Sequence, residues 1–224
     1  VILREAEKEA DIIIWDGGNN DFSFYVPDLE IVVVDPHRSG DELSYYPGEV
    51  NFKRADVIVI NKMDTSEGSS VQRLKNNIQS CNSGAVVIEA RSPVFAEQGS
   101  MIAGQRVLVV EDGPTLTHGG MKFGAGLLAA KKYGAKEIVD PRPWLTGTLI
   151  DTFEKYPEIG HLLPAMGYGK EQINDLEKTI NASDCDCVVI GTPIDLARVI
   201  DIQKPSVRVT YELEEIGRPN LETV

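Results

Sequence analysis

The sequence predicts an α/β protein whose sheets are mostly parallel and doubly wound. Two observations lead to this class. Short apolar runs rich in β-branched residues alternate along the chain with stretches that have helical spacing. Most of these runs are continuously apolar instead of alternating, as is typical of parallel strands that are buried on both faces. Polar residues follow the runs directly, which places candidate ligand contacts at the carboxyl edge of the sheets.

Eight apolar runs have the length and composition of strands. They are Ile12–Trp15, Ile31–Val34, Val57–Ile60, Val86–Ile88, Val107–Val110, Ile138–Val139, Val188–Ile190 and Val207–Val209. Four stretches between them have apolar residues at helical spacing: Ser69–Ser80, Phe123–Tyr133, Lys170–Ile180 and Asp195–Ile200. The first eleven residues, VILREAEKEAD, resemble the last turns of an amphipathic helix and indicate a fragment of a longer chain.

Composition excludes several classes of function. The 224 residues are 42% hydrophobic, which is enough for a core, and 35 acidic against 22 basic residues give a net charge of −13. This balance argues against a nucleic-acid or anionic-membrane partner, because neither can be bound without clustered cations. No apolar run approaches the roughly 18 residues of a membrane span.

The three cysteines fit a reducing cytosol, so a cytoplasmic location is expected. Two interpretations stay open for Cys185 and Cys187. They are half of a zinc site or, by default, residues that lead into a strand.

Four consecutive strands are expected to end in polar groups. These are Asp16-Gly17-Gly18, Asp35-Pro36-His37-Arg38, Asn61-Lys62-Met63-Asp64 and Glu89-Ala90-Arg91-Ser92. An aspartate at a buried strand end can hold Mg²⁺, and glycines beside it let the backbone approach a phosphate. We therefore expect Asp16 to bind Mg²⁺, with Asp35 as a helper and Gly17 and Gly18 near the nucleotide. The alternative for Asp16 is a turn that caps the next segment.

The stretch VIVINKMD is more specific. Asn-Lys-x-Asp after an apolar strand resembles the base-reading motif of GTPases, so Asn61, Lys62 and Asp64 are expected to surround a nucleotide base. Glu89 and Arg91, one strand later, are candidates for a second base-contacting loop. A nucleotide site of this kind also needs a phosphate loop, G-x-x-x-x-G-K-[ST], and no such string occurs in the chain.

The missing phosphate loop predicts that this chain is the carboxyl-terminal part of a larger enzyme. Residues 1–105 would complete a P-loop NTPase-like nucleotide-binding domain, and residues 106–224 would form a smaller α/β substrate-binding domain. The small, polar stretch EQGSMIAGQ supplies the boundary. Alone, the chain is expected to bind nucleotide weakly and to turn over nothing.

The second half carries a glycine-rich stretch, VEDGPTLTHGGMKFGAG, between an expected strand and an expected helix. Such a loop at a helix amino terminus favours anions; the alternative is a long tight turn. Arg142 in DPRPW could contact an anion or lie in a surface turn, and Thr192 in GTPID could contact phosphate or cap a helix. The candidates for substrate binding are His37, Thr115, Thr117, His118, Gly119, Gly120, Arg142 and Thr192.

Long strings resemble the cyclic 2,3-diphosphoglycerate synthetases over essentially the whole chain: DIIIWDGGNNDFSFYVPDLEIVVVDPHRSGDELSYYPGEVNFKRADVIVINKMD, EDGPTLTHGGMKFGAG, DPRPW and GTPIDLARVIDIQKPSVRVTYELEE. The resemblance implies an ATP-dependent ligase that closes 2,3-bisphosphoglycerate into an intramolecular phosphoanhydride, with Mg²⁺ required. Asp16, Arg38 and Lys122 would then act in catalysis.

Two questions stay open at this point. Asn-Lys-x-Asp ordinarily selects guanine, so GTP is the alternative to ATP. A GTPase-like switch or a metallochaperone-type NTPase is the alternative function. The sequence also leaves a homodimer open.

Overall fold

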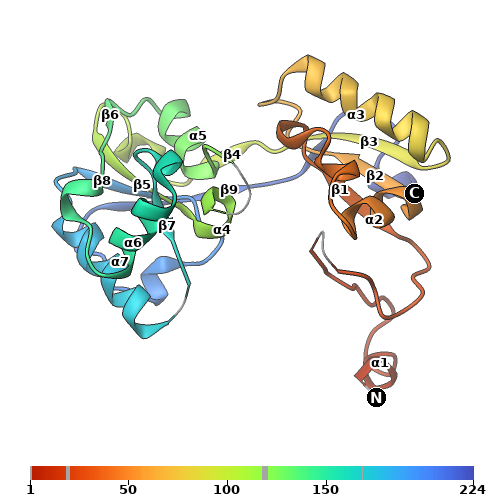
Figure 1. The fold of residues 1–224 in the computed structure, drawn as a ribbon, viewed down its shortest axis with the longest axis horizontal. Helices are drawn as coiled ribbons and strands as arrows, with labels where there is room; N and C mark the ends of the chain where they lie inside the picture. The colour runs from red at the N-terminus through yellow and green to blue at the C-terminus, as the bar shows by residue number, and fades with distance from the viewer. Residues whose placement is uncertain (1, 19–20, 118–120, 168) are drawn as a thin grey trace. The chain divides into compact units, whose positions relative to one another are not determined.

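The computed structural model describes residues 2–18, 21–117, 121–167 and 169–224. The chain forms two compact units, one made of Val1–Ser92 with Leu213–Val224 and the other of Pro93–Glu212. Each unit contains one mixed, mostly parallel sheet, of four strands in the first unit and six in the second (Figure 1). The expected α/β class with mostly parallel sheets is therefore confirmed.

The sheet of the first unit has the order β1-β2-β3-β10. Strands β1 (Ile31–Val34), β2 (Val57–Ile60) and β3 (Val86–Arg91) are parallel, and β10 (Glu214–Glu215) pairs with β3 in the antiparallel direction. Helices α2 (Gly48–Arg54) and α3 (Gly68–Cys81) supply Phe52, Leu74 and Ile78 to a core with Ile58 and Ile60 of β2. All four residues of β2 are buried, as its continuously apolar sequence predicts.

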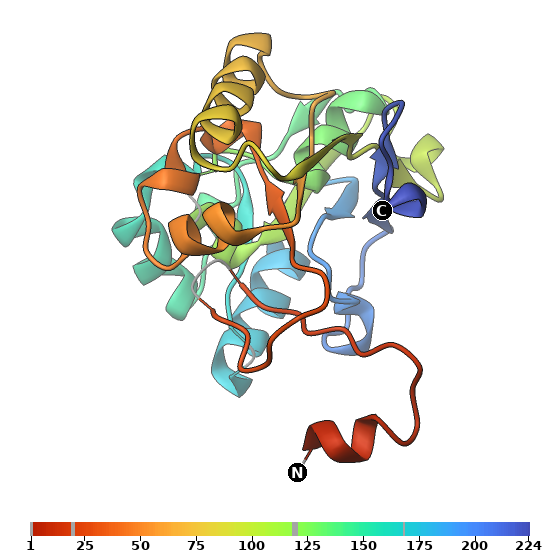
Figure 2. The same ribbon diagram turned by 90° about the vertical axis from the view of Figure 1, so that its right-hand side faces the viewer.

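The segment before β1 differs from the prediction. Helix α1 (Ile2–Ala6) is present, but the strand expected over 12–15 is not formed, and that expectation was wrong. Ile12 and Ile14 are 80% and 85% exposed, and no described residue offers them a backbone ladder (Figure 2). An apolar run becomes a strand only when a neighbour pairs its N–H and C=O groups. Sequence pattern alone could not supply that neighbour.

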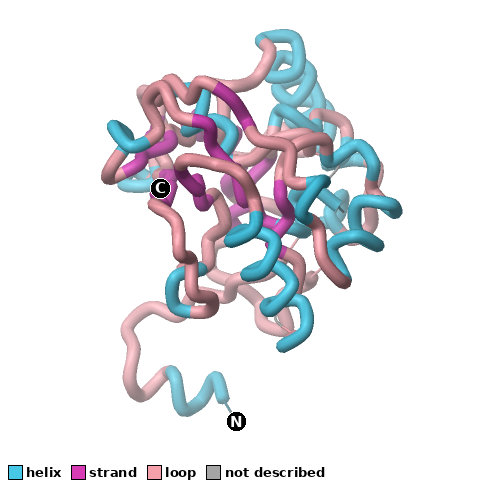
Figure 3. The backbone as a smooth tube through the Cα atoms, turned by 90° about the vertical axis from the view of Figure 1, so that its left-hand side faces the viewer, coloured by secondary structure: helices cyan, strands magenta, loops and turns pink. Residues whose placement is uncertain are grey.

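The second unit is a wound sheet with helices around it (Figure 3). Its strands are β4 (Val94–Ala96), β5 (Arg106–Asp112), β6 (Glu137–Ile138), β7 (Leu163–Ala165), β8 (Cys187–Ile190) and β9 (Ser206–Tyr211). Its helices are α4 (Gly113–Thr117), α5 (Ala125–Lys132), α6 (Thr148–Lys155) and α7 (Lys170–Ala182). In the described parts of both units, short 3₁₀ turns cover Pro36–Arg38, Asp41–Leu43, Gly99–Met101, Arg142–Trp144, Pro157–Ile159, Leu196–Arg198 and Leu221–Thr223.

Strand β5 lies at the centre of the second sheet. The main order is β4-β9-β8-β5-β6, and β7 also pairs with β5. Val107 pairs with both Ile138 and Cys187, and Val110 pairs with both Leu163 and Ile190. Strands β6 and β7 therefore lie on one side of β5, and β8 lies on the other. The core of the unit is built on β5, β8 and β9 together with α5 and α7.

The division of the chain differs from a boundary at residue 105. Strand β4 pairs with β9, so residues 93–105 pack with the second unit. The last twelve residues instead return to the first unit, where β10 pairs with β3. Both assignments depend on pairing between segments more than 100 residues apart, which local composition does not report.

Candidate functional site

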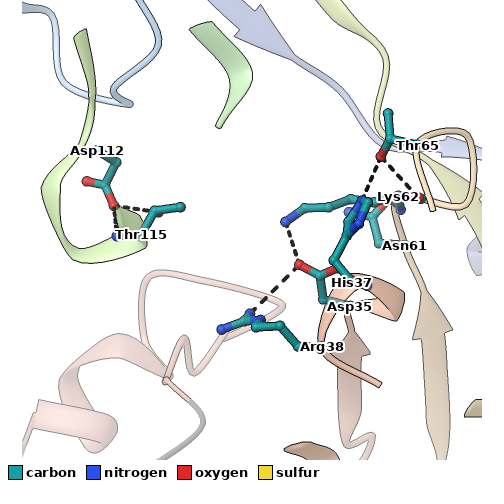
Figure 4. Close-up of polar contacts among 8 residues, drawn as sticks. All are labelled: Asp35, His37, Arg38, Asn61, Lys62, Thr65, Asp112 and Thr115. Atoms are coloured by element: carbon teal, nitrogen blue, oxygen red, sulfur yellow. Dashed lines mark hydrogen bonds and ion pairs between the residues drawn. The ribbon is translucent and has the colours of Figure 1, made fainter. Parts of the chain in front are cut away.

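The carboxyl ends of β1 and β2 bring Asp35, Asn61 and Lys62 together. The strands pair in register from Ile31 opposite Val57 to Val34 opposite Ile60, so the residues that follow them meet at one edge. Lys62 Nζ donates to Asp35 Oδ2 at 2.7 Å, and the Asp35 side chain is 10% exposed (Figure 4). A nearly buried carboxylate paired with a lysine is a fixed pair of opposite charges at the edge where ligands of open sheets bind.

The backbone at Lys62 is unusual. Its φ is 56°, the left-handed region that residues other than glycine seldom occupy. The Asn61 side chain stabilises this turn, because its Oδ1 accepts a hydrogen bond of 2.8 Å from the Lys62 N–H. Met63 N–H bonds to the carbonyl of Ala90 on the neighbouring strand. The chain therefore holds Lys62 in a costly conformation that aims its ammonium group at Asp35.

His37 and Arg38 lie in the turn that follows β1. The Asp35 side chain accepts the His37 N–H at 3.0 Å, and the His37 ring bonds to Thr65 Oγ1 at 2.9 Å (Figure 4). Arg38 Nη2 lies 3.9 Å from Asp35 Oδ2. Asp35 thus organises both the lysine after β2 and the turn after β1.

The remaining residues predicted to contact the base lie around β3. Asp64 Oδ1 accepts the Ser92 N–H at 3.1 Å, which ties the loop after β2 to the end of β3. Arg91 is 2.7 Å from Glu214, so its guanidinium is held by β10. Glu89 pairs with Lys75 of α3 and lines a cavity of about 460 Å³ that also includes Arg218. These residues are neighbours in one unit, and their role at a base stays a prediction.

Asp16, Gly17 and Gly18 lie in the extended segment that was expected to end a strand. All three are exposed, and Gly18 N–H donates to Asp21 Oδ2 at 3.0 Å. Asp21 N–H donates in return to the Gly18 carbonyl at 3.1 Å. Metal binding by Asp16 stays a prediction.

Two adjacent carboxylates follow the apolar run of β5 in the second unit. Glu111 accepts the N–H groups of Gly124, Gly126 and Leu127 at 3.2, 3.2 and 2.7 Å, which are the free donors at the start of α5. Asp112 accepts from Thr115 N and Oγ1 at 3.2 and 2.8 Å and so caps α4 (Figure 4). The side chains of Asp112 and Glu111 therefore fix the start of α4 and the start of α5, which flank the glycine-rich stretch.

Burial changes the acidity of Glu111. Its side chain is 1% exposed, and this desolvation raises the pKa of the carboxyl group to about 7. The three N–H donors oppose that shift, since they stabilise the charged form. Glu111 therefore takes the place at the α5 amino terminus that an anionic ligand was expected to occupy.

The other candidates of the second half lie in the segments that follow β5, β6 and β8. Thr117 Oγ1 donates to the carbonyl of Gly113 at 2.9 Å, and Arg142 forms a fork with the Asp140 carboxylate, which holds the pKa of Asp140 below its usual range. Lys122 is exposed, whereas Thr192 is buried. His118, Gly119 and Gly120 lie outside the described residues. None of these observations tests a role in substrate binding.

In the described ranges, no group of three or more His, Cys, Asp or Glu side chains is placed to hold a metal ion. None of the helices there combines the length and apolar character that crossing a membrane requires. Cys187 opens β8 and is buried, and Cys185 precedes it.

Sequence reasoning did not single out Glu111 and Asp112. The signal was present, because both acids directly follow the buried run Val107–Val110, just as Asp35 follows its own strand. The stretch was interpreted through its glycines, which suggested an anion site. What could not be foreseen is that Glu111 bonds to backbone groups 13 to 16 residues away.

Together, fold and site define an α/β protein with polar clusters at the carboxyl edges of two mixed, mostly parallel sheets. No protein-family model matches the chain. It is 63% identical over 223 residues to a protein of Thermococcus kodakarensis named arginine synthetase ArcE. The alignment covers all of this chain and 50% of that relative, so the chain spans about half of its length.

This similarity overturns the identification with cyclic 2,3-diphosphoglycerate synthetases. A relative with 63% identity along the whole chain is named for making arginine. The expected closure of 2,3-bisphosphoglycerate was therefore wrong, and the alternative of a GTPase-like switch or metallochaperone is replaced as well. The error has a physical reason. Polar strand ends and glycine-rich loops suit phosphates in general, so they do not identify the molecule that a nucleotide activates.

Proposed function

We propose that this chain is part of an enzyme that forms arginine, with a nucleoside triphosphate as the energy source. The observation that carries the proposal is the 63% identity over the full chain to arginine synthetase ArcE. A synthetase couples bond formation to nucleotide cleavage, and the first unit has strand ends suited to a nucleotide. The chain spans half of that relative. In this proposal, the complete activity also needs residues that correspond to the other half.

The nucleotide is assigned to the first unit. Asn61 and Asp64 flank the strained Lys62, and Asp35 lies within 2.7 Å of the lysine Nζ. We take ATP as the nucleotide and keep GTP as the alternative, because the Asn-Lys-x-Asp pattern favours guanine. The support is the concentration of these side chains at one sheet edge, where open parallel sheets bind ligands.

Mg²⁺ is part of the same proposal. Mg²⁺ keeps several waters and uses one or two carboxylates together with phosphate oxygens. Asp35 fits this role best through water, because Oδ1 already accepts the His37 N–H and Oδ2 pairs with Lys62. Asp16 is the second candidate. When bound, the ion would neutralise phosphate charge.

The test uses a chimaera in which this chain replaces the 223 matched residues of the Thermococcus kodakarensis protein. A catalyst accelerates both directions of its reaction. In the presence of Mg²⁺, the enzyme should therefore cleave a C–N bond of arginine with water, releasing the two precursors, while ADP and phosphate condense to ATP and give up that water. ATP is measured by luciferase, and AMP with pyrophosphate is assayed in parallel. We expect ATP formation that requires arginine and does not occur with lysine. ATP formation without arginine, or none with any of these substrates, would overturn the proposal.

The nucleotide site is tested in the same assay. Lys62→Ala removes the ammonium group that pairs with Asp35, and we expect the KM for nucleotide to rise roughly tenfold, the effect of losing one charged hydrogen bond. The matched control is Lys53→Ala, which removes an exposed lysine of α2 that pairs with Glu49. Repeating the titration with GDP identifies the base. Equal KM values for both variants would move the nucleotide site elsewhere.

A further inference from the structure

The topology of the second sheet marks one place where a ligand is expected. The connection from β5 leads to β6 and β7 on one side, whereas the connection from β8 leads to β9 on the other. Neighbouring strands whose connections leave in opposite directions form a topological switch point, and open parallel sheets bind ligands there. The carboxyl ends of β5 and β8, with the four residues Glu111, Asp112, Gly191 and Thr192, are called the β5–β8 edge below.

Register decides which side chains share a face at this edge. Val110 pairs with Ile190, and Gly191 N–H bonds to the Val110 carbonyl at 2.7 Å, so the pairing continues past β8. A methyl group on Gly191 would come within 2.5 Å of Glu111 Oε2, which places residues 111 and 191 on one face. Asp112 is the last residue of β5 and Thr192 is the second residue after β8, so both lie at the same carboxyl edge of the sheet.

Thr192 lacks the partner that a buried hydroxyl normally has. It is 1% exposed, and within the described parts of the chain its Oγ1 has no hydrogen-bond partner. Buried polar atoms are almost always hydrogen-bonded, because leaving one unsatisfied destabilises the fold. An orphaned, buried hydroxyl at a switch point is the kind of group that a ligand satisfies.

The groups at this edge indicate the charge of that ligand. The donors at the start of α5 are taken by Glu111, and Arg142 is held by Asp140, so these cationic and N–H groups are already engaged. Asp112 uses Oδ2 for Thr115, and a carboxylate can accept further bonds on its other lone pairs. In the described part of this edge, the free lone pairs of the Asp112 carboxylate and the unpaired Thr192 hydroxyl are acceptors that suit a positively charged donor.

We propose that the β5–β8 edge binds the guanidinium group of arginine, with the Asp112 carboxylate as the main acceptor and the Thr192 hydroxyl as the second. This assignment rests on the proposed function and adds the location of the amino acid to it. A guanidinium is planar and carries five N–H donors, so it can bond to a carboxylate and still reach a neighbouring hydroxyl.

Two variants separate the site from the fold. Asp112→Asn keeps a side-chain oxygen that caps α4, because asparagine is as good a cap as aspartate, but it removes the charge. Thr192→Val replaces the orphaned hydroxyl by a methyl group of similar volume. The matched control is Asp184→Asn, which removes a carboxylate that pairs with Arg106 at the opposite, amino end of β8 and β5.

Calorimetric titration of the 224-residue chain with arginine is the direct test. We expect Asp112→Asn to weaken arginine binding by about 10- to 100-fold and Thr192→Val by roughly threefold or more, with Asp184→Asn unchanged. Thr192→Val should also raise the melting temperature of the unliganded chain, because it removes an unsatisfied polar group. A purely structural hydroxyl would give that stabilisation without any loss of binding.

The outcomes distinguish this inference from the proposed function. Arginine-dependent ATP formation by the chimaera with an unchanged arginine KM in Asp112→Asn and Thr192→Val would overturn the β5–β8 site and leave the function standing. Absence of that activity would remove the function, and the calorimetry would still decide the site. A wild-type chain that binds no arginine, or an Asp112→Asn variant that binds arginine as tightly as wild type, would refute the assignment.

Discussion

At the scale of single residues, Glu111 and Asp112 are adjacent carboxylates in contrasting surroundings. Glu111 is almost completely buried and bonds to three backbone N–H groups of one helix start, whereas Asp112 is half-buried and caps another. The pKa of Glu111 is raised to about 7 from an ordinary value of 4.5. Folding thus favours the protonated form of this one side chain.

This shift predicts how stability changes with pH. A carboxyl group whose pKa is higher in the folded state adds stability that is complete below pH 4.5 and is lost as the pH rises to about 7. The loss is about 3 kcal/mol. Glu111→Gln cannot ionise, so its unfolding free energy relative to wild type should rise by that amount between pH 4.5 and about pH 8. Urea unfolding at several pH values measures it, and parallel curves for the two proteins would contradict it.

At the scale of elements, α6 depends on a residue from another helix. Asp175 of α7 is 6% exposed and accepts from Thr148 N and Oγ1 at 2.9 and 3.1 Å. Gly147, with a φ of +51°, lies just before α6, and any side chain there would overlap the Asp175 carboxylate. The start of α6 is therefore fixed by a cap that comes from 27 residues away.

Removing this cap should destabilise the second unit. Asp175→Ala leaves the Thr148 donors unpaired in a partly buried place, and we expect a loss of about 2 kcal/mol in the free energy of unfolding. Trp144 fluorescence in a Trp15→Phe background reports on this unit alone, because the chain has two tryptophans. Glu154→Ala, at an exposed position of α6, is the control. A loss equal to that of the control would show that the cap contributes nothing.

The sequence predicted those strands and helices whose formation depends on residues close together in the chain. Seven of the expected strands form, and α3, α5 and α7 appear within a few residues of their predicted bounds, because apolar periodicity marks them. Helices α2, α4 and α6 were not foreseen. Residues 195–200 give only a 3₁₀ turn. The run at 12–15 has the composition of a strand, but no described strand pairs with it. Helix α6 is capped by Asp175 of another helix and not by a residue nearby in the sequence.

The candidate site was predictable to a similar degree. Asp35, Asn61 and Lys62 come together because parallel strands in register end at one edge, and that rule needs no coordinates. The φ of Lys62 and the ion pairs of Arg91 and Glu89 depend on tertiary contacts. The orphaned hydroxyl of Thr192 is a property of packing, which the string GTPID could not reveal.

At the scale of the whole molecule, the second unit is one uninterrupted stretch, Pro93–Glu212, inserted into the first. Its two ends are paired, because Val94 of β4 lies opposite Tyr211 of β9. A continuous stretch with its own core and adjacent ends has what a domain needs to fold alone. We expect residues 93–212, expressed separately, to unfold cooperatively.

The measurement is urea unfolding of residues 93–212 followed by Trp144 fluorescence. Its midpoint should match that of the second unit within the chain that carries Trp15→Phe. Residues 1–92 without 213–224 are the comparison, because they lack β10 and should be less stable than the complete first unit. A broad, non-cooperative transition of 93–212 would mean that the second unit depends on the first.

The antiparallel pairing of β4 with β9 also has a mechanical consequence. The chain enters the second unit at the first residue of β4 and leaves it at the last residue of β9, and these two residues are partners. Tension applied where the chain crosses between the units would break the hydrogen bonds of this pair one after another, starting at the end where the force acts. Such a pair resists little force. The second unit would therefore open first at β4 and β9, the strands through which the chain enters and leaves it.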